Sequence, residues 1–182
     1  MQPLKVLAIC GSLRAASTNL GLLRFARENA PEGMEIKLAD LSDVPFYNAD
    51  LKEKPAAVLR LLADIEQADA LLLGCPEYNY SLAPALKNAL DWASREKDNH
   101  LLTGKPAAIM GAGGGMGTSR SQYHLRQVGV FLNLHLLNKP EVFCNAFAGD
   151  FDAAGNLIGE KTQALVIEQL GALKNWTQRL SL

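Results

Sequence analysis

The residues best suited to chemistry lie in one short stretch, CGSLRAASTN, at positions 10–19. It stands between an apolar run, LKVLAI, and an apolar-periodic segment, LGLLRFA, so it predicts a turn from a strand into a helix. Its hydroxyl, amide and guanidinium groups are suited to binding a phosphate, and they come from Ser12, Arg14, Ser17, Thr18 and Asn19. The turn either cleaves a phosphate with Cys10 or holds the phosphate of a bound ligand.

A nucleophilic cysteine fits this spacing poorly. A cysteine-dependent phosphatase needs its thiolate and a phosphate-binding arginine at the two ends of one loop, usually with about five residues between them. Position 16 is then expected to be arginine but is Ala16, and Arg14 comes too early. Cys10 also continues an apolar strand, where a buried and unreactive thiol is expected. We therefore favour a turn that holds a phosphate.

The second interpretation uses the free backbone N–H groups of a helix that begins near Thr18. The helix dipole stabilises an anion there by about 0.3–1 kcal/mol beyond its hydrogen bonds. The alternative is that Ser17 or Thr18 only caps the helix and that Arg14 is solvated. The sequence has no G-x-x-x-x-G-K-[ST] motif and no G-x-G-x-x-G motif. With the motifs for nucleoside triphosphates and dinucleotides absent, the remaining ligand type is a small cofactor with a single terminal phosphate. FMN is the candidate of this type in a doubly wound fold.

Two further loops have compositions suited to a flat ligand. The first follows an apolar run and consists of Pro76, Glu77, Tyr78, Asn79 and Tyr80. Its rings and backbone amides suit the edge of an isoalloxazine ring, with core or interface packing as the alternative for the tyrosines. The second is GAGGGMGTSRS, in which Gly111, Gly113 and Gly114 let backbone approach a planar ligand. A mobile surface loop is the alternative there.

Apolar runs and helical periodicity alternate along the chain. The runs predict strands at 4–10, 34–40, 69–75, 105–111 and about 135–144. The periodic segments predict helices near 18–30, 55–68, 83–95, 118–133 and 160–180, and a small hairpin is expected around 154–156. This alternation predicts one α/β domain over residues 1–182, with a five-stranded parallel sheet in the doubly wound order 2-1-3-4-5 and helices on both faces. That order brings all three loops to the carboxyl edge of the sheet, where ligands bind.

Composition argues against several classes of partner. A net charge of −1 predicts no nucleic-acid binding, because such proteins normally carry a basic stripe. No apolar stretch approaches the roughly 20 residues that span a membrane, so no membrane association is expected. Three widely spaced cysteines, and an N-terminus unlike a signal peptide, predict a reducing, cytoplasmic location. The three histidines lack ligand spacing, so no metal site is expected.

The three loops together resemble the NADPH-dependent FMN reductase family, which includes bacterial quinone, azo-dye and chromate reductases. The resemblance covers essentially the whole chain, and its matching segments are GSLRAASTN, PEYNYSLAPALKNALDWASR, the glycine loop and SQYHLRQ. It implies an FMN phosphate held by Ser12, Arg14, Ser17, Thr18 and Asn19. It places along the flavin Pro76, Glu77, Tyr78, Asn79 and Tyr80. The glycine loop then closes over another edge of the ring, through Gly111, Gly113 and Gly114.

The same resemblance implies a flavodoxin-like fold, bound FMN and NAD(P)H as the hydride donor. It implies a homodimer or homotetramer, with contacts from the third helix and from YHLRQVGVFLNLHLL. Arg120 and Glu141 either pair across such a contact or are solvated, and the role of Glu77 stays open.

We expect two-electron transfer by a ping-pong mechanism to quinones or similar small acceptors, namely azo compounds, chromate or free flavin. The alternative is a flavodoxin-like FMN electron carrier without small-molecule turnover. Such carriers tend to be strongly acidic, which the near-neutral charge does not favour.

Overall fold

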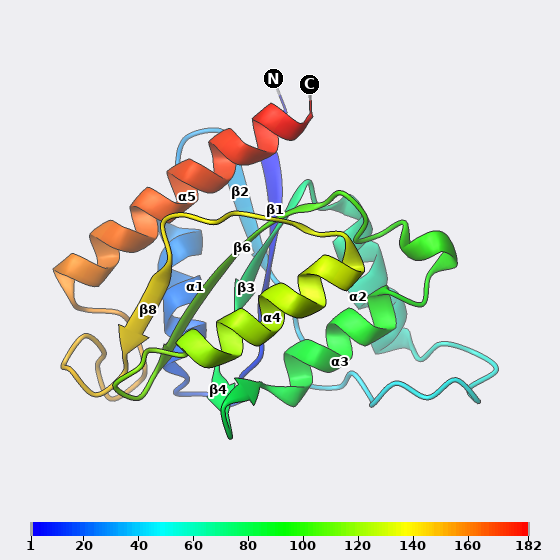
Figure 1. Cartoon of the computed structure of the whole chain (residues 1–182), viewed down its shortest axis with the longest axis horizontal. Coiled ribbons are helices and arrows are strands. Elements are labelled where there is room, and N and C mark those ends of the chain that lie inside the picture. Colours follow the sequence, from blue (N-terminus) through cyan, green and yellow to red (C-terminus); the bar gives the residue numbers. More distant parts are fainter. Residues whose placement is uncertain (1, 182) are drawn as a thin grey trace.

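A computed structural model describes residues 2–181 of the chain. Its elements, drawn in Figure 1, are β1 (Leu4–Cys10), α1 (Thr18–Glu28), β2 (Met34–Leu38), α2 (Ala56–Gln67), β3 (Ala70–Gly74), β4 (Glu77–Tyr78), β5 (Ser81–Leu82), α3 (Pro84–Ala93), a 3-10 turn (Lys97–Asn99), β6 (Pro106–Gly113), α4 (Ser119–Leu132), β7 (His135–Leu136), β8 (Val142–Asn145) and α5 (Glu160–Leu180). All five predicted helices are present, with ends that differ from the prediction by at most two residues.

The main sheet is parallel and has the order β2-β1-β3-β6, with β7 and β8 both paired to the far side of β6. The predicted α/β class with a flavodoxin-like parallel sheet is therefore confirmed, but the sheet has six strands where five were predicted. The carboxyl ends of β1, β3, β6 and β8 point to one edge, at the bottom of Figure 1. The small β4–β5 hairpin, which the sequence analysis did not predict, lies at that edge as well.

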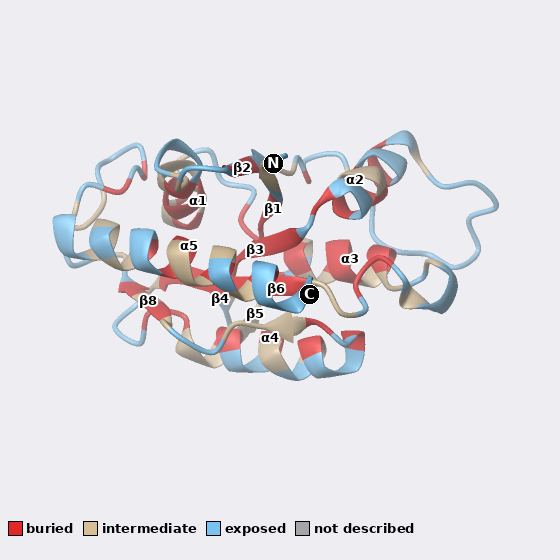
Figure 2. Ribbon diagram, turned by 90° about the horizontal axis from the view of Figure 1, so that it is seen from above, coloured by how far each residue is buried: buried red, intermediate tan, exposed pale blue. Residues whose placement is uncertain are grey.

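Successive side chains of the central strands point to alternate faces of the sheet, and a hydrophobic core forms on each face. In β1, Leu7 and Ile9 pack with residues of α2, α3 and α4, whereas Val6 and Ala8 pack with residues of α1 and α5. Successive side chains of a strand point to opposite faces, so one apolar run serves both cores. Figure 2 shows the helices on the two sides of the sheet with their buried residues turned inward. Each fully buried leucine or isoleucine contributes about 1.5–3 kcal/mol.

Helices α1 and α3, which follow the loops after β1 and β3, each begin at a residue type that favours a helix start. Ser17 is extended and caps α1, because its side-chain oxygen accepts a hydrogen bond from the backbone N–H of Leu20 at 3.2 Å. Pro84 is the first residue of α3, where its missing N–H costs nothing. The first turns of both helices therefore stand directly beside the loops that follow β1 and β3.

The fifth strand differs from the single predicted strand at 135–144. It is split into β7 and β8, and the segment between them contains Pro140, which has no N–H to donate to a strand ladder. The buried amide of Gln169 in α5 takes up the unpaired groups, since its Nε2 donates to the carbonyls of Ile109 at 3.0 Å and Pro140 at 2.8 Å. A side chain from the last helix thus completes the edge of the sheet.

The turn predicted around 154–156 is present as a small hairpin. An isolated antiparallel bridge joins Phe151 to Leu157, and the N–H of Asp152 donates to the carbonyl of Asn156 at 3.0 Å. Across residues 2–181, no helix combines the length and the apolar character that crossing a bilayer requires.

Candidate functional site

The loop between β1 and α1 presents a short polar surface at the carboxyl edge of the sheet. Ser12 and Ser17 are buried, and the Ser12 hydroxyl accepts a hydrogen bond from the N–H of Arg14 at 3.5 Å. Thr18 is half-buried at the first position of α1. The first N–H groups of α1 have no intrahelical acceptor, and the positive end of the helix dipole lies at the same place. This arrangement is suited to binding an anion.

Arg14 is exposed beside this helix end. Within residues 2–181, its guanidinium makes no hydrogen bond or ion pair with another residue. An arginine left without a partner retains its planar set of donors for an incoming oxyanion. Arg14 therefore adds a positive charge and directed donors to the polar surface of the loop.

Asn19 lies in the predicted phosphate loop, but its side chain has another partner. The amide Nδ2 donates to the carbonyl of Ala112 at 2.7 Å, and Oδ1 accepts from the N–H of Ala112 at 3.0 Å. Both contacts are buried and join the start of α1 to the end of β6. In this geometry, Asn19 positions the loop and offers an anion its backbone N–H.

The loop after β3 forms the β4–β5 hairpin, and Asn79 and Tyr80 are its two turn residues. Both have left-handed backbones, with φ of 50° and 66°, as a two-residue turn between twisted strands requires. Tyrosine rarely adopts such a φ, so contacts outside the turn must hold Tyr80 in place. The guanidinium of Arg120, 3.7 Å from the centroid of the Tyr80 ring, provides one.

Glu77 ties this hairpin to the start of α4. Its carboxylate forms an ion pair with Arg120 and accepts a hydrogen bond from the N–H of Ser121 at 3.3 Å. The Glu77 carboxylate raises the pKa of Arg120. Glu141 instead pairs with Lys139 at 2.6 Å. Within one chain, Arg120 thus pairs with Glu77, which gives Glu77 a positioning role.

Four of the five glycines of the third loop divide into two groups. A Cβ on Gly111 would lie 2.1 Å from the Thr118 hydroxyl, and one on Gly113 would lie 2.8 Å from the Thr118 methyl group. These two glycines are therefore required by the packing of Thr118 inside the protein. Gly114 and Gly115 have no atom within 4 Å of a built Cβ, so open space lies beside them. The backbone at this second pair is open to close approach by a planar ligand.

A cavity of about 480 Å³ adjoins the first two loops. Arg14 and Tyr78, two predicted site residues, both line it, and the Tyr78 side chain is 43% exposed. The rest of its lining comes mainly from the loop after β2 and the first turns of α3, including Leu41, Val44, Phe46 and Asn88. A smaller cavity of about 180 Å³ is also lined by Arg14 and reaches Ser12.

Sequence reasoning missed the loop after β2. The signal was available, because Phe46 and Tyr47 are adjacent aromatic residues in a loop that follows a strand. Loops at the carboxyl ends of parallel strands commonly carry binding residues.

The three cysteines, Cys10, Cys75 and Cys144, are free and buried. Burial raises the pKa of the Cys10 thiol above its ordinary value, and it raises the pKa of Cys75 to about 11. A protonated, buried sulfur is a poor nucleophile. Cys10 also packs among core residues of α1 and α5, so the geometry gives no support to a cysteine-dependent phosphatase.

Comparison with known proteins also points away from a phosphatase and toward an FMN-dependent reductase. A family model described as NADPH-dependent FMN reductase matches residues 4–149. The chain is 51% identical over 180 residues to an NAD(P)H-dependent FMN reductase of Pseudomonas aeruginosa, covering 97% of each protein. It is 38% identical over 187 residues to a quinone reductase of Escherichia coli, covering 100% of this chain and 99% of the relative.

Among solved structures, the chain is similar to FerB from Paracoccus denitrificans, described as a flavoenzyme NAD(P)H:(acceptor) oxidoreductase. The TM-score is 0.87 and the sequence identity is 33%, with 96% of this chain and 97% of the other covered.

Proposed function

The chain belongs to the NADPH-dependent FMN reductase family, and we propose that it passes two electrons from NAD(P)H to quinones by a ping-pong mechanism. It is an oxidoreductase that uses FMN as cofactor and NAD(P)H as electron donor. Further acceptors in this proposal are azo compounds, chromate and free flavin. The observation that carries the proposal is the unpartnered Arg14 beside the N-terminus of α1, next to a cavity that Tyr78 also lines.

The residues present fit FMN. In the proposal, Ser12, Arg14, Ser17 and Thr18 hold the phosphate, together with the first N–H groups of α1. Asn19 keeps the loop against β6 and contributes its backbone N–H. The ring then lies along Pro76, Glu77, Tyr78, Asn79 and Tyr80. Its other edge faces the glycine loop. There the backbone at Gly111 and Gly113 packs closely against Thr118, and Gly114 borders open space.

Bound FMN supplies two-electron hydride chemistry, which no amino-acid side chain offers. The overall reaction is NAD(P)H + H⁺ + quinone → NAD(P)⁺ + hydroquinone, so one hydride and one proton reach the quinone. The protein orients the reactants and leaves the ring accessible to each in turn. We assign no proton transfer to Glu77, because Arg120 and the N–H of Ser121 already occupy its carboxylate.

Absorption spectroscopy tests the proposal. Purified protein should absorb near about 450 nm as a flavoprotein, lose this band when NAD(P)H is added without oxygen, and recover it when benzoquinone follows. A flavoprotein that is reduced rapidly only through a reductase protein partner would be the FMN electron carrier of the alternative interpretation. A colourless protein that does not bind added FMN would contradict both.

We also propose that the protein forms a homodimer or homotetramer through α4. Tyr123, Val130 and Phe131 on this helix are exposed, the last two by 81% each. Exposed apolar side chains grouped on one helix commonly mark an interface. The third helix was expected to contribute too, but its apolar residues Leu86 and Leu90 are fully buried in the core of the same chain. Light scattering after size-exclusion chromatography measures the mass, and a monomer would contradict this proposal.

A further inference from the structure

The cavity of about 480 Å³ has one wall that comes from outside the predicted FMN site. Leu41, Val44 and Phe46 provide this wall, and all three belong to the loop after β2. Leu41 is buried and packs into the core, whereas Phe46 is 76% exposed. Phe46 thus combines exposure with a place in the cavity lining, so its ring is available to contact a ligand there.

Helix α3 holds this wall from one side. The carbonyl of Pro45 accepts hydrogen bonds from Asn88 Nδ2 at 2.9 Å and from Trp92 Nε1 at 2.8 Å. The N–H of Tyr47 donates to Asn88 Oδ1 at 2.8 Å. The Tyr47 ring also packs edge-on against Trp92, with centroids 5.0 Å apart. Both neighbours of Phe46 are thus fixed to one helix.

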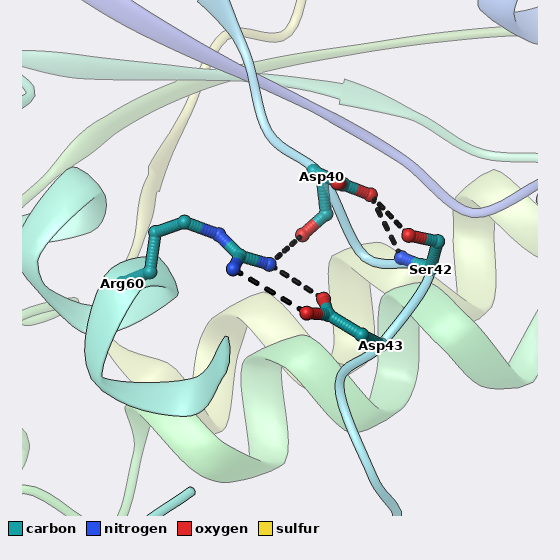
Figure 3. A network of polar contacts seen from close by, with 4 residues as sticks. All are labelled: Asp40, Ser42, Asp43 and Arg60. Carbon is teal, nitrogen blue, oxygen red and sulfur yellow. Dashed lines mark hydrogen bonds and ion pairs between the residues drawn. The ribbon is translucent and has the colours of Figure 1, made fainter. Parts of the chain in front are cut away.

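Helix α2 holds the other end of the same loop, as Figure 3 shows. The guanidinium of Arg60 binds the carboxylate of Asp43, at 2.5 Å for the shorter contact, and donates to the carbonyl of Asp40 at 3.4 Å. The Asp40 carboxylate accepts from the N–H and the hydroxyl of Ser42, which holds the pKa of Asp40 below its usual value. The loop is therefore anchored on both sides of Val44.

These anchors make the cavity preformed. Binding to a preformed wall avoids the entropy cost of ordering a loop, which favours small ligands with few contacts. The volume lies in the range of small-molecule sites. The lining combines apolar side chains with the Arg14 guanidinium and the Tyr78 ring. A flat, mostly apolar molecule with polar atoms at its edge matches this lining better than a small hydrated anion does.

We propose that this cavity binds the ring of a quinone acceptor and that Phe46 determines the preference for flat aromatic acceptors over small inorganic oxidants. The inference rests on the proposed function, because Arg14 and Tyr78 belong to both the cavity and the predicted FMN site. Phe46 contacts the acceptor in this proposal and has no part in holding FMN.

The test compares two acceptors with the FMN-loaded enzyme and saturating NADPH. One is 1,4-naphthoquinone, which fits the cavity, and the other is ferricyanide, which is a small hydrated anion. In Phe46→Ala, the ratio of kcat/KM for naphthoquinone to kcat/KM for ferricyanide should fall about threefold to tenfold, the size of a lost aromatic contact. Ala85→Phe, which fills the cavity from α3, should lower the same ratio. Phe147→Ala is the matched control, because Phe147 is 85% exposed and does not line the cavity.

A ratio that stays constant in both cavity variants would overturn the inference. So would a lower FMN content in Phe46→Ala with an unchanged ratio, since the cavity would then serve the cofactor. A change in mass by light scattering in Phe46→Ala would assign the ring to a subunit contact instead. The proposed function fails separately, if the unaltered protein oxidises NADPH with neither acceptor.

Discussion

The side-chain amide of Asn19 closes a reciprocal pair of hydrogen bonds on the backbone of Ala112, which is 93 residues away in the sequence. The donated bond is 2.7 Å long and the accepted bond is 3.0 Å long. Through this pair, the N-terminus of α1 is fixed to the strand that leads into the glycine loop. Two of the three loops of the site therefore share one anchor.

Asn19→Ala should lower the free energy of unfolding by about 2–4 kcal/mol, because it leaves the buried N–H and carbonyl of Ala112 without partners. Urea denaturation measures the change. Asn29→Ala is the control, since Asn29 is exposed and bonds only within α1, and it should cost about 0.5 kcal/mol. Equal losses in the two variants would show that the pair with Ala112 is not a principal anchor.

Arg14→Ala should weaken FMN binding by about 1–3 kcal/mol, the scale of a charge-assisted hydrogen bond to phosphate. Fluorescence titration of the apoprotein with FMN measures the dissociation constant. Arg27→Ala in the last turn of α1 removes the same charge far from the phosphate loop, and it should leave the constant unchanged. If both variants weaken FMN binding alike, Arg14 acts through general electrostatic attraction and not through a specific contact with the phosphate.

Gly21→Ala should destabilise the protein by about 1–3 kcal/mol, the usual cost of overpacking. A Cβ on Gly21 would lie 1.8 Å from the carbonyl oxygen of Gly155, so the turn around Asp152–Asn156 presses directly on the first turns of α1. The variant should also bind FMN less tightly, because the phosphate loop moves with α1.

The control for this substitution is Gly171→Ala in the middle of α5. No atom lies within 4 Å of a built Cβ at Gly171, so the higher helix propensity of alanine should raise stability by up to about 1 kcal/mol. Thermal unfolding compares the two variants. A neutral Gly21→Ala would mean that the turn is free to move away from α1.

The thiols of the native protein should react slowly at pH 8 and faster as the pH rises toward 11. Burial raises the pKa of Cys75 to about 11 and that of Cys144 to about 12, so the thiol form persists at pH 8 and the reactive thiolate is rare. Alkylation with iodoacetamide, followed by mass spectrometry across this pH range, measures the rates. All three cysteines should react readily once the protein is unfolded in guanidinium chloride.

The companion variant Cys10→Ser should retain reductase activity, because a buried thiol takes no part in the proposed reaction. Rapid alkylation of Cys10 at pH 8 in the native protein would contradict the buried state. Loss of activity in Cys10→Ser with a full FMN content would restore a chemical role for the sulfur.

The sequence sufficed for features that depend on local pattern. The unbroken apolar runs of β1 and β3 predict central strands, and the polar stretch after β1 predicts a helix start near Thr18, which is where α1 begins. These features are local because a strand buried on both faces needs a continuous apolar run, and a helix start needs a polar residue. Both patterns lie within a few consecutive residues.

Features that depend on partners distant in the chain could not be predicted. Gln169 bonds to Ile109 across 60 residues and so completes the split fifth strand. Asn88 fixes the Phe46 loop across about 40 residues, and Asn19 was assigned to phosphate although its amide binds Ala112. In each case a polar side chain satisfies buried backbone groups, and its sequence neighbours do not reveal which ones.

The comparison of FMN with riboflavin tests the central claim most directly, because the two differ only in the phosphate that the loop after β1 is proposed to hold. Titration of the apoprotein with each should give a dissociation constant for FMN at least about 100-fold lower than that for riboflavin, as two charge-assisted hydrogen bonds require. Equal constants for the two flavins would contradict the account, since the loop would then contribute nothing to cofactor binding.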